Sequence, residues 1–149
     1  MSKWELPIEE KFEVVAGDYQ RAGEASSSIK RVLRDLKLSS AMMRRVAVAS
    51  YEAELNLVIH SLGGSLQVNI DEQQVILISK DRGPGIPSVV KAMESGFSTA
   101  TDEARDMGFG AGMGLPNMKK NASEFKITST EEGTTLVMRF FLDQQEEEE

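Results

Sequence analysis

The 149-residue sequence contains no cysteine, a single histidine and few aromatic residues. The lack of cysteine excludes disulfide bonds, thiolate catalysis and zinc sites built on cysteine. One histidine is too few for a metal centre built on several histidines. No apolar run approaches the roughly 20 residues that span a bilayer, and the first residues contain no apolar stretch typical of a secretory signal. We therefore expect a soluble, cytoplasmic protein that does not enter a membrane.

The sequence also lacks an excess of positive charge. It has 17 Lys and Arg against 24 Asp and Glu, a net charge of −7, and its last four residues are all glutamate. An acidic surface argues against non-specific binding to nucleic acid, which depends on cations that neutralise phosphates. The length and the 40% hydrophobic content are typical of one globular domain. We expect that domain over residues 1–142 and an acidic, disordered tail over 143–149.

The hydrophobic pattern predicts strands that cluster in hairpins and do not alternate regularly with helices. The expected strands cover residues 8–15, at a sheet edge, 66–70, 75–79, 124–130 and 134–142. The expected helices cover residues 18–38, with Asp18 as N-cap, 39–62, 87–95 and 115–122. A long glycine-rich loop should connect the last two helices. This order favours an α+β fold, a two-layer α/β sandwich with a mixed, mainly antiparallel sheet and helices on one face.

Glu52, Asn56 and His60 are spaced four residues apart, so they share one face of the second long helix. An amide oxygen and a carboxylate are suitable oxygen groups around Mg²⁺, and a glutamate can also deprotonate a nucleophile. A solvated polar face beside an apolar stripe that runs from Val46 to Leu57 explains the same spacing.

Asp81, Gly83 and Gly85 follow a predicted strand directly. The glycines allow a close approach that side chains would block, and the carboxylate could accept a hydrogen bond from an exocyclic amine such as that of adenine. A tight turn has the same composition.

Four alternating glycines, from Gly108 to Gly114, lead into a predicted helix. Backbone amides at a helix N-terminus bind anions, so this loop fits a phosphate cradle, although a flexible connector also fits. The Walker pattern and the GxGxxG fingerprint are both absent. Gly133 and Thr134 open the last strand, where the Thr134 hydroxyl could lie near Asp81 if the two strands are neighbours; a threonine in a strand is otherwise ordinary.

Taken together and in this order, the four segments resemble the ATP-binding domain shared by gyrase, Hsp90, histidine kinases and MutL. Glu52 and Asn56 resemble its asparagine box, Asp81-x-Gly83-x-Gly85 its first glycine box, residues 110–115 its second, and Gly133-Thr134 its threonine box. The small single-domain size is similar to that of bacterial anti-sigma factor serine kinases and stressosome switch kinases. Residues 81–98 and 112–116 resemble the switch kinases especially, and residues 52–60 resemble the anti-sigma kinases equally. The loop at 99–107 is longer than expected for the switch kinases.

The resemblance implies a Bergerat-type fold that binds ATP and Mg²⁺. Glu52 matches the proposed general base, Asn56 the Mg²⁺ ligand and Asp81 the carboxylate that reads adenine. The nucleotide-binding residues that it implies are Asn56, Asp81, Gly83, Gly85, Ile86, Gly110, Gly112, Met113, Gly114, Leu115 and Thr134. Arg105 and Lys119 could also reach phosphates, but both also fit ordinary surface charges.

The resemblance further implies a protein-serine kinase that phosphorylates an anti-anti-sigma protein and regulates transcription by partner switching. Related anti-sigma kinases are commonly dimers, although no interface signature is visible here. The alternative is a nucleotide-dependent module that sequesters a sigma factor or another regulator without significant catalysis. An interaction protein with a degenerate pocket is disfavoured, because Glu52, Asn56, Asp81 and the glycines are all present.

Overall fold

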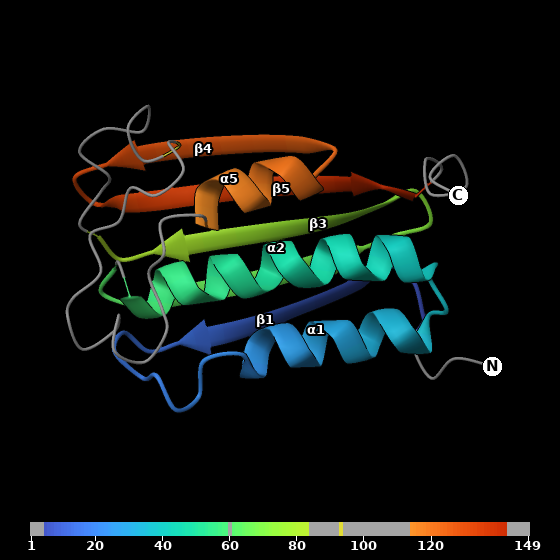
Figure 1. Cartoon of the computed structure of the whole chain (residues 1–149), viewed down its shortest axis with the longest axis horizontal. Coiled ribbons are helices and arrows are strands. Elements are labelled where there is room, and N and C mark those ends of the chain that lie inside the picture. The colour runs from blue at the N-terminus through green and yellow to red at the C-terminus, as the bar shows by residue number, and fades with distance from the viewer. Residues whose placement is uncertain (1–4, 60, 84–92, 94–113, 143–149) are drawn as a thin grey trace.

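The computed structural model describes residues 5–59, 61–83, 93 and 114–142. Within these ranges, three helices pack on one face of a five-stranded antiparallel sheet (Figure 1). The strands are β1 (Ile8–Val14), β2 (Gly64–Ile70), β3 (Gln74–Asp81), β4 (Glu124–Thr130) and β5 (Gly133–Phe141). The helices are α1 (Glu24–Asp35), α2 (Ser40–Ile59) and α5 (Gly114–Asn121). The predicted α+β class and the two-layer arrangement are confirmed.

The strand order in the sheet is β1-β2-β3-β5-β4, and β1 lies at an edge as predicted. All four strand pairings in the described part of the chain are antiparallel, so the expectation of a mixed sheet is wrong for these strands. The reason is the place of β5. The chain crosses over through α5 and returns in β4 with the same direction as β3, but β5 lies between the two and pairs with both.

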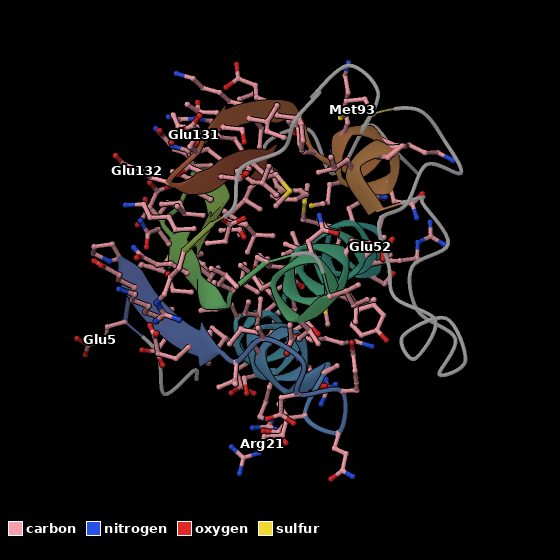
Figure 2. The ribbon with its side chains drawn as sticks, turned by 90° about the vertical axis from the view of Figure 1, so that its left-hand side faces the viewer. Glu5, Arg21, Glu52, Met93, Glu131 and Glu132 are labelled. Carbon is pink, nitrogen blue, oxygen red and sulfur yellow. The ribbon has the colours of Figure 1, made fainter. Side chains whose placement is uncertain are left out.

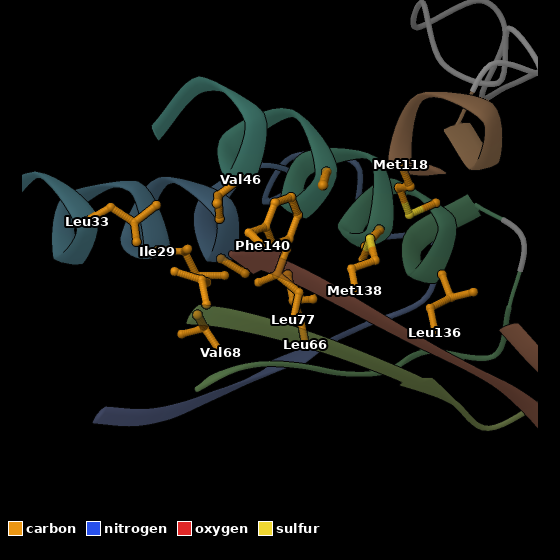
Figure 3. Close-up of a cluster of buried hydrophobic side chains, with 14 of the residues drawn as sticks. Ile29, Leu33, Val46, Leu66, Val68, Leu77, Met118, Leu136, Met138 and Phe140 are labelled. Carbon is orange, nitrogen blue, oxygen red and sulfur yellow. The ribbon is translucent and has the colours of Figure 1, made fainter. Parts of the chain in front are cut away.

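The core lies between the helices and the inner face of the sheet (Figure 3). Alternate residues of the central strands point into it, as the period of two in a β-strand requires. The apolar stripe predicted on the second long helix is confirmed, because its members are at most 1% exposed. The largest fully buried side chains are Phe140, Ile29, Leu33, Met42, Leu57, Leu66, Ile70, Leu77, Met118 and Met138.

The first helix begins later than the sequence predicts. Its N-cap position is Gly23, with a φ of 104° and no side-chain cap, and Asp18 lies outside the helix in an ion pair with Arg21 at 3.7 Å. The second helix does have a local cap, because Ser39 Oγ accepts a hydrogen bond from the Met42 N–H at 3.1 Å. The first helix therefore needs a cap from elsewhere in the chain.

Several chain segments meet at one end of the molecule, on the left in Figure 1. They are the C-terminal end of β3, the start of β5, the C-terminal half of α2 and the start of α5. The helix predicted over residues 87–95, apart from residue 93, and the acidic tail over 143–149 lie outside the described residues. None of the helices in the described ranges is long and apolar enough to span a membrane. The shared end gathers the described parts of all four segments that the sequence singled out.

Candidate functional site

Asp81 is the last residue of β3, and the backbone around it fixes its carboxylate. Its Oδ1 accepts hydrogen bonds from the N–H groups of Gly83 at 2.9 Å and Thr134 at 2.8 Å. Its Oδ2 has no hydrogen-bond partner among the described residues. Charge-assisted bonds from backbone amides are strong and directional. One carboxylate oxygen is therefore anchored, and the second is left to accept a bond from another donor.

Gly133 allows β5 to start directly against this carboxylate. Its φ is 149°, a conformation that side chains rarely adopt. A Cβ atom at this position would overlap the main-chain oxygen of Asp81 and lie 2.8 Å from its Oδ1. Any larger residue would push the carboxylate away from the Thr134 amide. The glycine before the threonine is thus a steric requirement of the Asp81 site.

Thr134 lies beside Asp81, because β3 and β5 are neighbours in the sheet. The contact is made by the Thr134 amide and not by its hydroxyl, in contrast to the sequence-based expectation. The hydroxyl instead shares a hydrogen bond of 2.9 Å with Ser129 Oγ on β4. Thr134 is only 6% exposed, and this hydrogen bond joins β4 to β5 next to the turn of their hairpin.

Glu52 and Asn56 lie one turn apart on α2, and both side chains are partly exposed. The start of α5 faces them. Asn117 Nδ2 donates a hydrogen bond to Glu52 Oε2 at 3.0 Å, and a Cβ atom on Gly114 would lie 3.3 Å from Asn56 Oδ1. Figure 2 shows Glu52 in the helical layer, on the side of α2 nearest α5. Two oxygen-bearing side chains therefore point into the space at the start of α5.

The described residues fit a nucleotide bound together with Mg²⁺. Gly114 itself brings no side chain to the Asn56 side-chain oxygen, from which a Cβ atom at this position would lie 3.3 Å away. No group of three or more His, Cys, Asp or Glu in the described ranges could hold a metal ion alone. Mg²⁺ commonly takes few protein ligands and fills its octahedron with water and phosphate oxygens, so a single amide oxygen such as Asn56 Oδ1 suits it. Asp81 Oδ2 suits an exocyclic amine.

The other predicted residues divide into two groups. Leu115 is only 7% exposed and packs into the hydrophobic core from the first turn of α5, whereas Lys119 is exposed in its last turn. The remaining predicted site residues lie outside the described residues: His60, Gly85, Ile86, Arg105, Gly110, Gly112 and Met113.

Two residues at this end of the molecule were not identified from the sequence. Asn117 looks like an ordinary polar residue in a short helix, and only the packing of α5 on α2 brings it to Glu52. Glu54 is 2% exposed, and its two oxygens accept the N–H groups of Ala25 and Ser26 at 3.1 and 2.9 Å. Glu54 thus supplies the cap that α1 lacks. The position of Glu54 within the apolar stripe of α2 was visible in the sequence. Because a buried carboxylate nearly always has a partner, that position predicts one.

Residues 44–146 match the family of histidine kinase-, DNA gyrase B-, and HSP90-like ATPases. The chain is 31% identical over 114 residues to the serine/threonine-protein kinase RsbT of Bacillus subtilis (strain 168), which covers 72% of this chain and 78% of the relative. It is also 32% identical over 101 residues to an anti-sigma F factor of Clostridium novyi (strain NT), which covers 63% of this chain and 67% of the relative. The family match includes α5 and both sides of the Asp81 site.

Proposed function

We propose that this chain, which belongs to the histidine kinase-, DNA gyrase B-, and HSP90-like ATPase family, is an ATP- and Mg²⁺-dependent protein-serine kinase. Its substrate would be a serine of an anti-anti-sigma protein, and it would regulate transcription in the cytoplasm by partner switching. The observation that carries the proposal is the shared position of Glu52 and Asn56 opposite the start of α5, at the same end of the molecule as the anchored Asp81 carboxylate. The similarity to a serine/threonine-protein kinase supports it.

The residues of the site have distinct roles in the proposal. Asp81 would accept a hydrogen bond from the adenine amine through Oδ2, while its Oδ1 stays on the backbone amides of Gly83 and Thr134. Asn56 would hold Mg²⁺, which supplies charge neutralisation on the phosphates. The remaining nucleotide contacts would come from Gly85, Ile86, Gly110, Gly112, Met113, Gly114 and Leu115.

Glu52 would act as the general base. The substrate serine oxygen forms a bond to the γ-phosphorus, its proton passes to the Glu52 carboxylate, and the bond to the bridging oxygen breaks to release ADP. Phosphoryl transfer depends mainly on positioning and charge neutralisation, and a general base adds about 10²–10⁴-fold. A partly exposed carboxylate on a rigid helix suits this role, because the hydroxyl of a protein substrate must reach it.

The test is transfer of labelled γ-phosphate from Mg-ATP to the serine of a candidate anti-anti-sigma protein. The wild type should transfer phosphate, and Glu52→Ala should lose about 10²–10⁴-fold in rate while it still binds ATP. Glu124→Ala is the matched control, because this exposed carboxylate only pairs with Arg139 at 3.6 Å across the surface, and such pairs contribute little. Undiminished transfer by Glu52→Ala would remove Glu52 as the base.

The similarity to an anti-sigma F factor favours a second candidate function. In this alternative the same nucleotide site controls stoichiometric binding of a sigma factor or another regulator, and no phosphate is transferred. Capture of a purified sigma factor that depends on ATP or ADP, without phosphoserine in any partner, would support this function over the kinase.

A further inference from the structure

Asn117 contacts the proposed general base from a different helix. Its Nδ2 lies 3.0 Å from Glu52 Oε2, across 65 residues of sequence. Asn117 is the only hydrogen-bond partner of the Glu52 side chain in the described part of the chain. We infer that Asn117 is a positioning residue that sets the orientation of the Glu52 carboxylate for phosphate transfer. This inference rests on the kinase function proposed above.

The chemistry of an asparagine amide suits this role. The NH₂ group donates to one carboxylate oxygen and carries no proton that it could exchange with the base at neutral pH. It therefore holds Oε2 without competing for the substrate proton, and Oε1 is left to accept it. A glutamate side chain has three rotatable bonds, and fixing it in a reactive geometry avoids an entropic cost during the reaction.

Asn117 is itself held on a well-anchored helix. Leu115 and Met118, on either side of it, are 7% and 0% exposed. Asn121 donates from Nδ2 to the Asn117 main-chain oxygen at 2.8 Å, and Arg45 of α2 donates from Nε to the Asn121 main-chain oxygen at 2.8 Å. A side chain carried by such a supported element can define geometry more precisely than one on a loop.

The same helix also faces the proposed Mg²⁺ ligand. Gly114, its first residue, lies against the Asn56 amide, one turn before the position of Asn117. Placement of α5 against α2 therefore sets the space at Asn56 and the orientation of Glu52 together. A merely structural role would instead make Asn117 a tie between two helices, with no influence on the chemical step.

The Asn117→Asp variant separates these two roles. The new side chain has the same shape, but it cannot donate a hydrogen bond when ionised, and its charge repels Glu52. It lies in the first turn of α5, where an acidic residue stabilises a helix. A structural tie predicts that either variant lowers the free energy of unfolding and leaves kcat of the folded protein unchanged. A positioning role predicts that kcat falls in Asn117→Ala and falls further in Asn117→Asp, because repulsion moves the Glu52 carboxylate away from its reactive orientation.

The experiment measures kcat and KM for ATP with the anti-anti-sigma protein that the wild type phosphorylates. Asn117→Ala should lower kcat about 10-fold, a part of the general-base contribution, with KM for ATP changed less than about 2-fold, and Asn117→Asp should lower kcat further. In a Glu52→Ala background neither variant should add a further loss, because both act through the same carboxylate. Asn69→Ala is the control, since this asparagine lies on the partly exposed face of β2, where its Oδ1 accepts a hydrogen bond from Gln67 Nε2 at 2.9 Å.

A second readout does not depend on activity. The side-chain amide resonance of Asn117 in the NMR spectrum should shift in Glu52→Ala, and an unchanged resonance would overturn the contact. A wild type that transfers phosphate together with an equally active Asn117→Ala would overturn the positioning role alone. A loss that falls on KM, or that Asn69→Ala shares, would also overturn it. A wild type that transfers no phosphate would overturn the proposed function, and the positioning role with it.

Discussion

Two glutamates on α2 have the same chemistry and opposite surroundings. Glu52 and Glu54 are two residues apart, a rotation of about 200° on a helix, so they face different neighbours. Glu54 is 2% exposed and uses both oxygens on the first amides of α1, whereas Glu52 is partly exposed and uses one oxygen on Asn117. The carboxylate whose oxygens are both engaged serves stability, and the one that keeps an oxygen accessible is available for chemistry.

The largest effect that we expect from either glutamate on the free energy of unfolding comes from Glu54. Glu54→Ala removes the acceptor from two buried backbone donors at the start of α1. Hydrogen bonds to charged groups contribute about 1.5–3 kcal/mol each, and a buried donor left without a partner costs a similar amount. We expect the free energy of unfolding to fall by about 3 kcal/mol, measured by denaturant unfolding.

Glu52→Ala is the matched control for this measurement, because it removes the same group two residues away from a partly exposed position. It should lower the free energy of unfolding by less than about 1 kcal/mol, the scale of one hydrogen bond that water can replace. If Glu54→Ala does not fold, Glu54→Gln keeps the shape and one acceptor oxygen and should lie between the wild type and the alanine variant. Equal losses for Glu52→Ala and Glu54→Ala would contradict the assignment of one structural and one accessible carboxylate.

Asp81 has one engaged oxygen, like Glu54, and one available oxygen, like Glu52. Its substitution gives the second-largest effect that we expect. Its Oδ1 holds two backbone amides, as Glu54 does, and its Oδ2 is left over, as one oxygen of Glu52 is. The Asp81→Asn variant would keep an acceptor for the amides but would present an NH₂ group where the adenine amine must donate. We expect Mg-ATP at about 100 times its Kd to stabilise the wild type by about 2.7 kcal/mol, measured by thermal unfolding. Asp81→Asn should abolish that gain.

Thermal unfolding of Asp81→Asn without nucleotide tests how much the Asp81 side chain contributes to the stability of the fold. Because the side-chain oxygen that remains in Asp81→Asn can still accept both amides, the melting temperature of this variant should lie within a few degrees of the wild type. A nucleotide shift of full size in Asp81→Asn would exclude Asp81 as the adenine-reading carboxylate. A variant that is already unfolded at the growth temperature would show that Asp81 serves the fold more than the site.

The parts of the fold that the sequence predicted are those governed by local periodicity. The β4–β5 hairpin follows from alternating apolar residues around Gly133, and the buried face of α2 follows from the spacing from Val46 to Leu57. The start of α1 was missed because its cap comes from Glu54, 29 residues away for Ala25, and no local pattern encodes it. The antiparallel sheet depends on the position of β5 between β3 and β4, which tertiary packing determines and no local pattern encodes.

The candidate site shows the same division. The four motifs contain Glu52, Asn56 and Asp81, because their residue types and spacing are visible along the chain. The contact that places Thr134 at Asp81 is made by its backbone amide, and sequence reasoning favoured the hydroxyl. Asn117 has no motif of its own and becomes relevant only where α5 packs on α2. Short-range patterns identify which groups are present, and packing decides which atoms of those groups meet.

The smallest expected effect compares a local cap with a distant one. Ser39 Oγ accepts the Met42 N–H three residues away, at the partly exposed start of α2. Ser39→Ala should lower the free energy of unfolding by about 1 kcal/mol, the usual cost of losing an N-cap, measured by denaturant unfolding beside Glu54→Ala. The difference has a physical cause. Water can reach the start of α2 and replace one neutral acceptor, whereas the amides of α1 are buried against a carboxylate that water cannot replace. If Ser39→Ala cost as much as Glu54→Ala, burial would not be the property that distinguishes the two caps.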